Sequence, residues 1–141
     1  MIASKLIAAA TLAIGLGAAS AMADTVAVVS SKSAIVTLSK TQLTDIFLGK
    51  TNRFPNGSAA VPIDQAEGSS ARDEFYEQIA EKSAAQVKAY WSRVIFTGRG
   101  QPPKTVPDSI AMMKLIHANP SAIGYMDAKL VDDTLRVVTL K

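Results

Sequence analysis

The first 23 residues of the chain limit which part of it can belong to a folded domain. Lys5 is followed by an uncharged, mainly apolar stretch, Leu6 to Gly17, and then by Ala21-Met22-Ala23. A short basic region, an apolar region of about a dozen residues and a small-x-small cleavage pattern together form a secretory signal peptide. We therefore expect cleavage between Ala23 and Asp24, export to the periplasm, and a single mature domain spanning residues 24–141.

The alternative for the same segment is an uncleaved membrane anchor. Gly15, Gly17 and Ser20 interrupt the apolar character of its second half. A membrane-spanning helix needs about 20 predominantly apolar residues, so this segment would span a bilayer only marginally. The sequence therefore favours cleavage over anchoring, and it contains no later stretch long enough to cross a membrane.

The composition argues against several classes of function. The chain has no cysteine and a single histidine, His117, which excludes disulfides and metal sites built from cysteine or several histidines. The formal net charge is only +3 and the basic residues are spread along the sequence, which is untypical of a nucleic-acid-binding protein. A serine nucleophile would need His117 as its base, and no Gly-x-Ser-x-Gly motif is present. We therefore expect a protein that is not an enzyme and has no cofactor or metal.

Segments with strand-like and helix-like patterns alternate along the mature chain. Ser39 with Gln42, and Ser83 with Gln86, have the spacing of capping boxes at helix starts. The expected strands are residues 25–29, 34–38, 59–63, 122–126 and 135–140, and the expected helices are residues 40–48, 71–81, 84–96 and 107–117. Pro62 places its strand at a sheet edge, or lies where the strand ends. This order predicts an α/β domain with a mixed or parallel sheet flanked by about four helices.

The candidate binding site is the segment Gly68-Ser69-Ser70 at the start of the second expected helix. The first turn of a helix carries N–H groups without partners and a partial positive charge, and both attract anions. Arg72 adds a cation that can hold an oxyanion. Ordinary helix capping explains the same pattern, and Glu67 and Asp73 would repel an anion unless one of them accepts its proton. Both interpretations stay open at this point.

Arg99, between Gly98 and Gly100, is the second candidate contact for an anion. A mobile basic loop can close over such a ligand, although arginines in loops are more often simply solvated. His117 falls at the end of the fourth expected helix, where a cation complements the helix dipole. We therefore interpret His117 as a capping residue and Trp91 as a core residue.

Four segments occur in an order that resembles the periplasmic phosphate-binding proteins of ABC transporters, and more closely their short single-domain relatives. They are Leu43–Lys50 (LTDIFLGK), Glu67–Ser70 (EGSS), Tyr90-Trp91 and Ala122–Tyr125 (AIGY). The resemblance covers about residues 38–126 and implies a periplasmic-binding-protein-like fold. It also implies a phosphate or related oxyanion ligand and an inner-membrane ABC permease as partner.

The resemblance also implies which residues would contact the ligand. Gly68 and Ser69 match the glycine and serine of the family's Asp-Gly-Ser-Gly-Thr stretch, while Glu67 replaces the aspartate and Ala71 the threonine. The family's upstream arginine falls near Gln65, which carries no charge, and we hypothesise that Arg72 substitutes for it. Full-length members are about twice as long, with two lobes around the ligand. A second protein or a second copy would then have to close the cleft.

Two hypotheses therefore remain open. The first is a non-enzymatic binding protein for phosphate or a related oxyanion, with Glu67, Gly68, Ser69, Ser70 and Arg72 at the site. The second is an interaction module that keeps the binding-protein scaffold but no longer binds a ligand tightly. A phosphate-ester hydrolase ranks behind both, because no metal-ligand cluster or nucleophile–base pair supports it.

Overall fold

A five-stranded mixed sheet forms the centre of the computed structural model, which describes residues 24–141. The predicted signal peptide lies outside the described residues. The strands are β1 (Thr25–Ser30), β3 (Val61–Gln65), β4 (Lys104–Val106), β5 (Ala122–Asp127) and β6 (Leu135–Val137), in the spatial order β4-β3-β5-β1-β6. β3 runs parallel to β4 and β5, whereas β1 runs antiparallel to β5 and β6. The predicted α/β class with a mixed sheet is therefore confirmed.

Four α-helices surround this sheet, as the sequence predicts. They are α1 (Lys40–Phe47), α2 (Ser70–Ala80), α3 (Ala84–Phe96) and α4 (Ser109–Ala118), with a short 3₁₀ helix, η1, at Ala128–Leu130. The capping boxes at Ser39 and Ser83 are both present. Two short strands, β2 (Thr37–Leu38) and β7 (Thr139–Leu140), pair in parallel beside the main sheet. None of the helices in residues 24–141 has the length and apolar character needed to span a bilayer.

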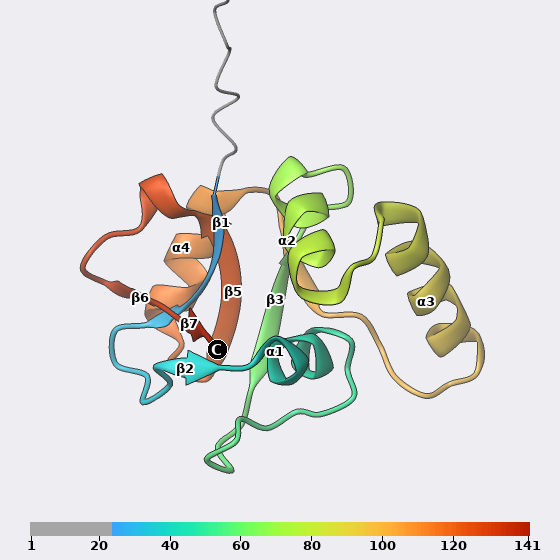
Figure 1. Cartoon of the computed structure of the whole chain (residues 1–141), viewed down its shortest axis with the longest axis horizontal. Helices are drawn as coiled ribbons and strands as arrows, with labels where there is room; N and C mark the ends of the chain where they lie inside the picture. The colour runs from blue at the N-terminus through green and yellow to red at the C-terminus, as the bar shows by residue number, and fades with distance from the viewer. Residues whose placement is uncertain (1–23) are drawn as a thin grey trace, which may run out of the picture.

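The core has two parts because successive strand residues point to opposite faces of the sheet. Ala27 and Val29 of β1 pack with α1, α2 and α3 in a cluster that includes six buried aromatic side chains, at residues 47, 54, 75, 76, 91 and 125. Val28 of β1 packs on the other face with Met112 and Ile116 of α4. Figure 1 shows α4 on one side of the sheet and α1 and α2 on the other. α3 lies at one end of the molecule, apart from the sheet, and Trp91 joins it to the first cluster.

Gly124 of β5 allows α4 to approach the sheet closely. A Cβ atom at this position would lie against Met112 Sδ and would come within 3.1 Å of Ile116 Cδ1. Both neighbours are fully buried, so neither can move without disturbing the packing between α4 and the sheet.

Several predicted boundaries are wrong. β3 is an interior strand despite Pro62, because β4 pairs with β3 only from Ile63 onward and leaves the proline beyond its end. α2 begins at Ser70, capped by Ser69, rather than at residue 71, and α4 begins after Asp108 rather than at Pro107. The sequence gives no prediction for residues 104–106, which form β4, and the final expected strand is divided into β6 and β7 at the buried Val138.

Candidate functional site

A hollow of about 450 Å³ lies at the sheet edge where β3 and β5 end. We call it the helix-terminus hollow. Its lining residues are Thr25, Gln65, Ser69, Ser70, Ala71, Pro107, Asp108, Ser109, Ile110, Asp127 and Leu130. These residues come from the start of β1, the ends of β3 and β5, and the first turns of α2 and α4. The carboxyl ends of parallel strands are the usual place for ligands in α/β sheets.

The first turn of α2 presents unused hydrogen-bond donors to this hollow. Gly68 has φ +92°, a left-handed conformation that glycine adopts without strain, and it turns the chain from β3 into the helix. Ser69 Oγ caps the helix by accepting from Arg72 N at 3.3 Å. The N–H groups of Ser70 and Ala71 have no acceptor among residues 24–141. They are therefore free to bind an anion.

The first turn of α4 has the same arrangement. Asp108 caps it by accepting from Ala111 N at 2.9 Å. The N–H groups of Ser109 and Ile110 are without an acceptor in the described part of the chain. Two helix N-termini, each with free N–H groups and partial positive charge, thus line the same hollow. The hydroxyl of Thr25, a buried residue in its wall, also has no hydrogen-bond partner within these residues.

Gln65 connects the two helix starts. Its Nε2 donates to Ser109 Oγ and to Tyr125 O, both at 3.2 Å, and its Oε1 accepts from Ser69 Oγ at 2.8 Å. Gln65 is 2% exposed. The side chain therefore uses its amide for bonds within the protein, and it fixes the first turn of α2 relative to that of α4.

The charged residues that line the helix-terminus hollow are both acidic. Asp108 and Asp127 lie in its wall, and no lysine or arginine is among its lining residues. The positive potential there comes from the two helix dipoles and the N–H groups rather than from a cation. A carboxylate beside an oxyanion is unfavourable unless a proton lies between them. This hollow therefore suits an oxyanion that still carries a proton.

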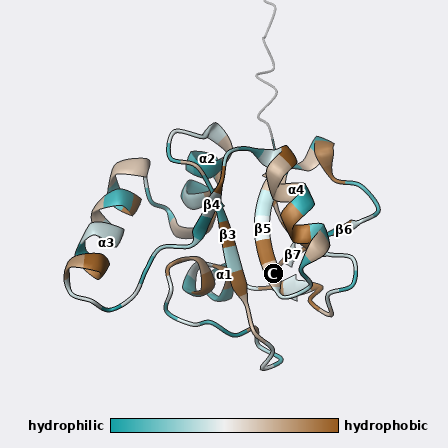
Figure 2. Cartoon of the chain, turned by 180° about the vertical axis from the view of Figure 1, so that it is seen from behind, coloured by the Kyte–Doolittle hydropathy of each residue, from teal (hydrophilic) through white to brown (hydrophobic). Residues whose placement is uncertain are grey.

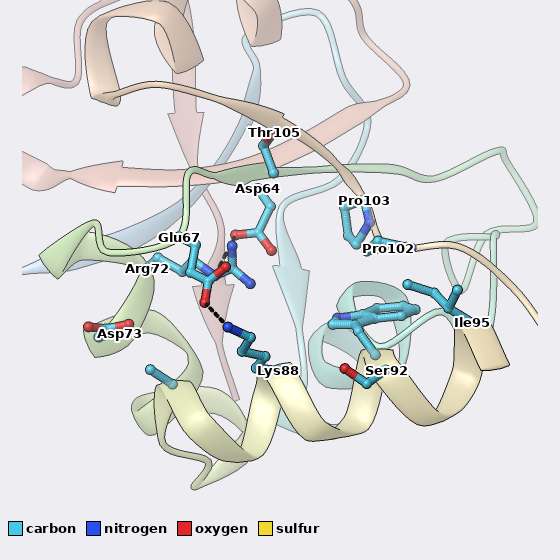
Figure 3. A pocket seen from close by; sticks show the side chains of 12 residues that line it. Asp64, Glu67, Arg72, Asp73, Lys88, Ser92, Ile95, Pro102, Pro103 and Thr105 are labelled. Atoms are coloured by element: carbon cyan, nitrogen blue, oxygen red, sulfur yellow. Dashed lines mark ion pairs between the residues drawn. The ribbon is translucent and has the colours of Figure 1, made fainter.

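Arg72 points to a different part of the molecule. Its Nε lies 3.9 Å from Asp64 Oδ1, and one of its terminal nitrogens donates to Gln65 O at 3.2 Å. Its guanidinium also lies over the ring of Tyr76, 5.8 Å from the centroid. Arg72 lines a second hollow of about 270 Å³ between α2, α3 and β4, shown in Figure 3. The structure thus separates Arg72 from the hollow that Ser69 and Ser70 line.

Asp64 is the centre of the buried polar cluster beside Arg72. Its carboxylate accepts hydrogen bonds from the hydroxyls of Tyr76, at 2.7 Å, and of Tyr125. Burial raises the pKa of both tyrosine hydroxyls well above its ordinary value, and the negative charge of Asp64 raises it further. This cluster holds β3, α2 and β5 together under the helix-terminus hollow.

The remaining sequence-predicted residues lie away from that hollow. The Glu67 side chain is exposed and pairs with Lys88 Nζ at 3.4 Å, beside Arg72 (Figure 3). Arg99 is exposed in the loop after α3 and lines neither hollow. Within residues 24–141, no three His, Asp or Glu side chains come together in a group that could hold a metal ion. Of the predicted set, Ser69 and Ser70 line the helix-terminus hollow, and Gly68 adjoins them.

Among the polar side chains of this hollow, sequence reasoning missed those of Thr25, Asp108, Ser109 and Asp127. Asp108 and Ser109 carried a usable signal, because Asp followed by an apolar-periodic segment is a helix start. Thr25 and Asp127 carried none, since their places in the wall follow from the antiparallel pairing of β1 with β5, in which they are partners.

The chain has no match among protein-family models or curated proteins, but it matches solved structures. A phosphate ABC transporter substrate-binding protein from Clostridium perfringens, solved with bound phosphate, is 21% identical with a TM-score of 0.66, over 82% of this chain and 44% of that chain. An ABC-type phosphate transport receptor from Vibrio cholerae is 16% identical with a TM-score of 0.65, and the match covers 82% of this chain and 45% of that receptor. PstS from Borrelia burgdorferi is 11% identical with a TM-score of 0.63, and the match covers 83% of this chain and 47% of PstS.

These matches cover most of this chain and less than half of each solved protein. At these identities they show the fold. The chain has the fold of the phosphate ABC transporter substrate-binding proteins, as its resemblance to that family predicts, and spans less than half their length.

Proposed function

We propose that the chain is a non-enzymatic periplasmic binding module for phosphate or a related oxyanion, linked to ABC-type uptake. The observation that carries this proposal is the convergence of two helix N-termini on one hollow. Four N–H groups, those of Ser70, Ala71, Ser109 and Ile110, line it without an acceptor in the described residues. Helix N-termini of this kind are anion-binding sites. The fold shared with phosphate-binding proteins supports the same ligand class.

The acidic lining makes the proposal more specific. Phosphate keeps a proton near neutral pH and can donate it to Asp108 or Asp127, whereas sulfate has none to donate. We therefore expect phosphate to bind and sulfate to be excluded.

The test is calorimetric titration of the protein with phosphate and with sulfate, after unfolding and refolding to remove any carried-over ligand. Ser70→Pro removes one free N–H at the first position of α2, where proline is well tolerated. We expect it to weaken phosphate binding about tenfold or more, which corresponds to one lost hydrogen bond to an anion. Ser70→Ala removes only the hydroxyl and should have a smaller effect.

Ala84→Pro is the matched control, because Ala84 holds the same first position in α3 and lies outside the helix-terminus hollow. It should leave phosphate binding unchanged. If phosphate gave neither saturable heat nor thermal stabilisation at millimolar concentration, oxyanion binding by the chain alone would be ruled out.

The second candidate function is an interaction module that keeps the scaffold without tight ligand binding. It is favoured by the length of the chain, which spans less than half of each solved relative and so offers one wall of a two-lobed cleft. An ABC permease, another protein or a second copy would then contribute the other wall. Phosphate affinity that appears only when such a partner is added would support this alternative.

A further inference from the structure

The C-terminal end of α3 carries two neighbouring apolar side chains that the fold does not cover. Phe96 is 90% exposed and Ile95 is 55% exposed. α3 buries Val87 and Trp91 and packs Tyr90 and Val94 against the same core cluster, whereas Ile95 and Phe96 at its end are left exposed. Figure 2 shows this end of α3 as a hydrophobic segment at one end of the molecule. Exposed apolar groups that gather in this way mark interaction surfaces.

The loop that follows α3 forms hollows beside these side chains. A hollow of about 290 Å³ is lined by Trp91, Pro102, Pro103 and Lys104, among others, and the 270 Å³ hollow of Figure 3 shares Trp91 and both prolines and includes Ile95. Trp91 is 5% exposed, and its Nε1–H has no acceptor in the described residues.

The charged residues of α3 and of the loop that follows it are all basic, whereas Asp64, Glu67 and Asp73 line the far side of the 270 Å³ hollow. Residues 83–107 contain four Lys or Arg and no Asp or Glu. Arg93, Arg99 and Lys104 are exposed, and none of them has an ion-pair partner in the part of the chain that the structure describes. The surface that combines these cations with Ile95, Phe96 and Trp91 is called the α3 surface below. Its charge is complementary to an acidic partner.

We propose that the α3 surface docks an acidic segment of another protein, in which carboxylates alternate with apolar side chains. The apolar side chains would cover Phe96 and enter the hollows beside Trp91, and the carboxylates would pair with Arg93, Arg99 and Lys104. The hollows favour a protein over an anionic membrane, because a bilayer surface does not fill a concave site. A second copy of this chain would bring the same basic surface and be repelled. The proposal is independent of phosphate binding.

The test uses Trp91, the single tryptophan of the chain, as a fluorescent reporter. The probe is a synthetic amphipathic peptide that alternates glutamate with leucine and phenylalanine. A second peptide with lysine in place of every glutamate, and vesicles of phosphatidylglycerol with phosphatidylcholine, are the comparison ligands. We expect the acidic peptide alone to change the Trp91 emission saturably, with an affinity that falls as salt is added.

Two variants locate the contact. Phe96→Ser should weaken binding of the acidic peptide about tenfold or more, the effect of losing a central apolar contact. Arg93→Glu combined with Arg99→Glu should abolish it. Both variants should fold normally, because these side chains are exposed. Val36→Ser is the matched control: Val36 is 55% exposed but lies outside this surface, so the change should leave peptide binding as it is.

Three outcomes would overturn the proposal. The first is equal binding of the acidic and basic peptides, or no binding of the acidic one. The second is a Phe96→Ser protein that binds as tightly as the unchanged protein. The third is binding to the vesicles in preference to the peptide, which would assign the surface to a membrane.

Discussion

Gln65 donates from Nε2 to Ser109 Oγ across 3.2 Å and so fixes the end of β3 to the first turn of α4. The same amide accepts from Ser69 Oγ, at the start of α2. The resemblance to phosphate-binding proteins implies an arginine near this position. In this chain a neutral side chain holds the two helix starts together, and the donors offered to a ligand come from the backbone.

Gln65→Met tests this arrangement. Methionine keeps the approximate volume but leaves Ser69 Oγ, Ser109 Oγ and Tyr125 O without their partner. The unfolding free energy should fall by about 1–3 kcal/mol, the cost of unsatisfied buried polar groups. Phosphate affinity should fall about tenfold or more, because the two sets of N–H groups lose their relative position. Chemical denaturation and calorimetry measure the two effects. Unchanged affinity in a destabilised variant would contradict the positioning role.

Arg72→Met should destabilise the protein without weakening phosphate binding. The guanidinium pairs with Asp64 and donates to Gln65 O, away from the helix-terminus hollow. Its removal should lower the unfolding free energy by about 1–3 kcal/mol, since Asp64 stays buried without its cation. Phosphate affinity measured by calorimetry should not change. A loss of binding at preserved stability would instead restore the hypothesis that Arg72 holds the anion.

Gly124→Ala should destabilise the protein through steric overlap. The added methyl group would press on Met112 Sδ and Ile116 Cδ1, and forced overpacking of a core costs about 1–3 kcal/mol. Gly100→Ala is the control, because its Cβ would meet only Val94 Cγ1 at an ordinary 3.7 Å. Thermal melting should show a clear decrease for Gly124→Ala and almost none for Gly100→Ala. Similar melting temperatures for both would show that α4 can shift away from the sheet.

The buried tyrosines predict a loss of stability in alkali. The pKa of Tyr76 and of Tyr125 is raised by burial, so both stay protonated in the folded state when the unfolded chain ionises above about pH 10. The unfolded state then binds fewer protons than the folded one, and stability falls as the pH rises. Below the ordinary tyrosine pKa this contribution is complete. Urea unfolding midpoints measured from pH 8 to 11 show this loss of stability. Tyr125→Phe should make the fall of the midpoint with pH less steep. If the midpoint of Tyr125→Phe fell with pH as steeply as that of the unchanged protein, the raised pKa of Tyr125 would not be a cause of the alkaline loss of stability.

The starts of α1 and α3 could be predicted from local patterns. The capping boxes of Ser39 and Ser83 depend on residues three positions apart, and the structure confirms both. β4 could not be predicted, because its three residues form a strand only through pairing with β3. The interior place of β3 was missed for the same reason: the effect of Pro62 depends on where the neighbouring strand begins, and the local sequence does not carry that information.

The candidate site was predicted in part, and helix geometry explains the rest. Ser70 and Arg72 are two residues apart on α2, which turns their side chains about 200° away from each other around the helix axis. They therefore face different hollows. The contribution of Ser109 and Asp127 depends on strand order, which brings distant segments to one edge. A single sequence offers no pattern for such contacts.

The position of Thr25 in the wall of the helix-terminus hollow has a consequence for export. Cleavage after Ala23, as the sequence predicts, would create an α-amino group one residue before Thr25. Such a group is positively charged below about pH 8. Processing would thus place a positive charge next to Thr25 in the chain, beside a hollow whose lining side chains include no cation. On the proposed function, protein that begins at Asp24 should therefore bind phosphate more tightly than protein with a residual leader or tag.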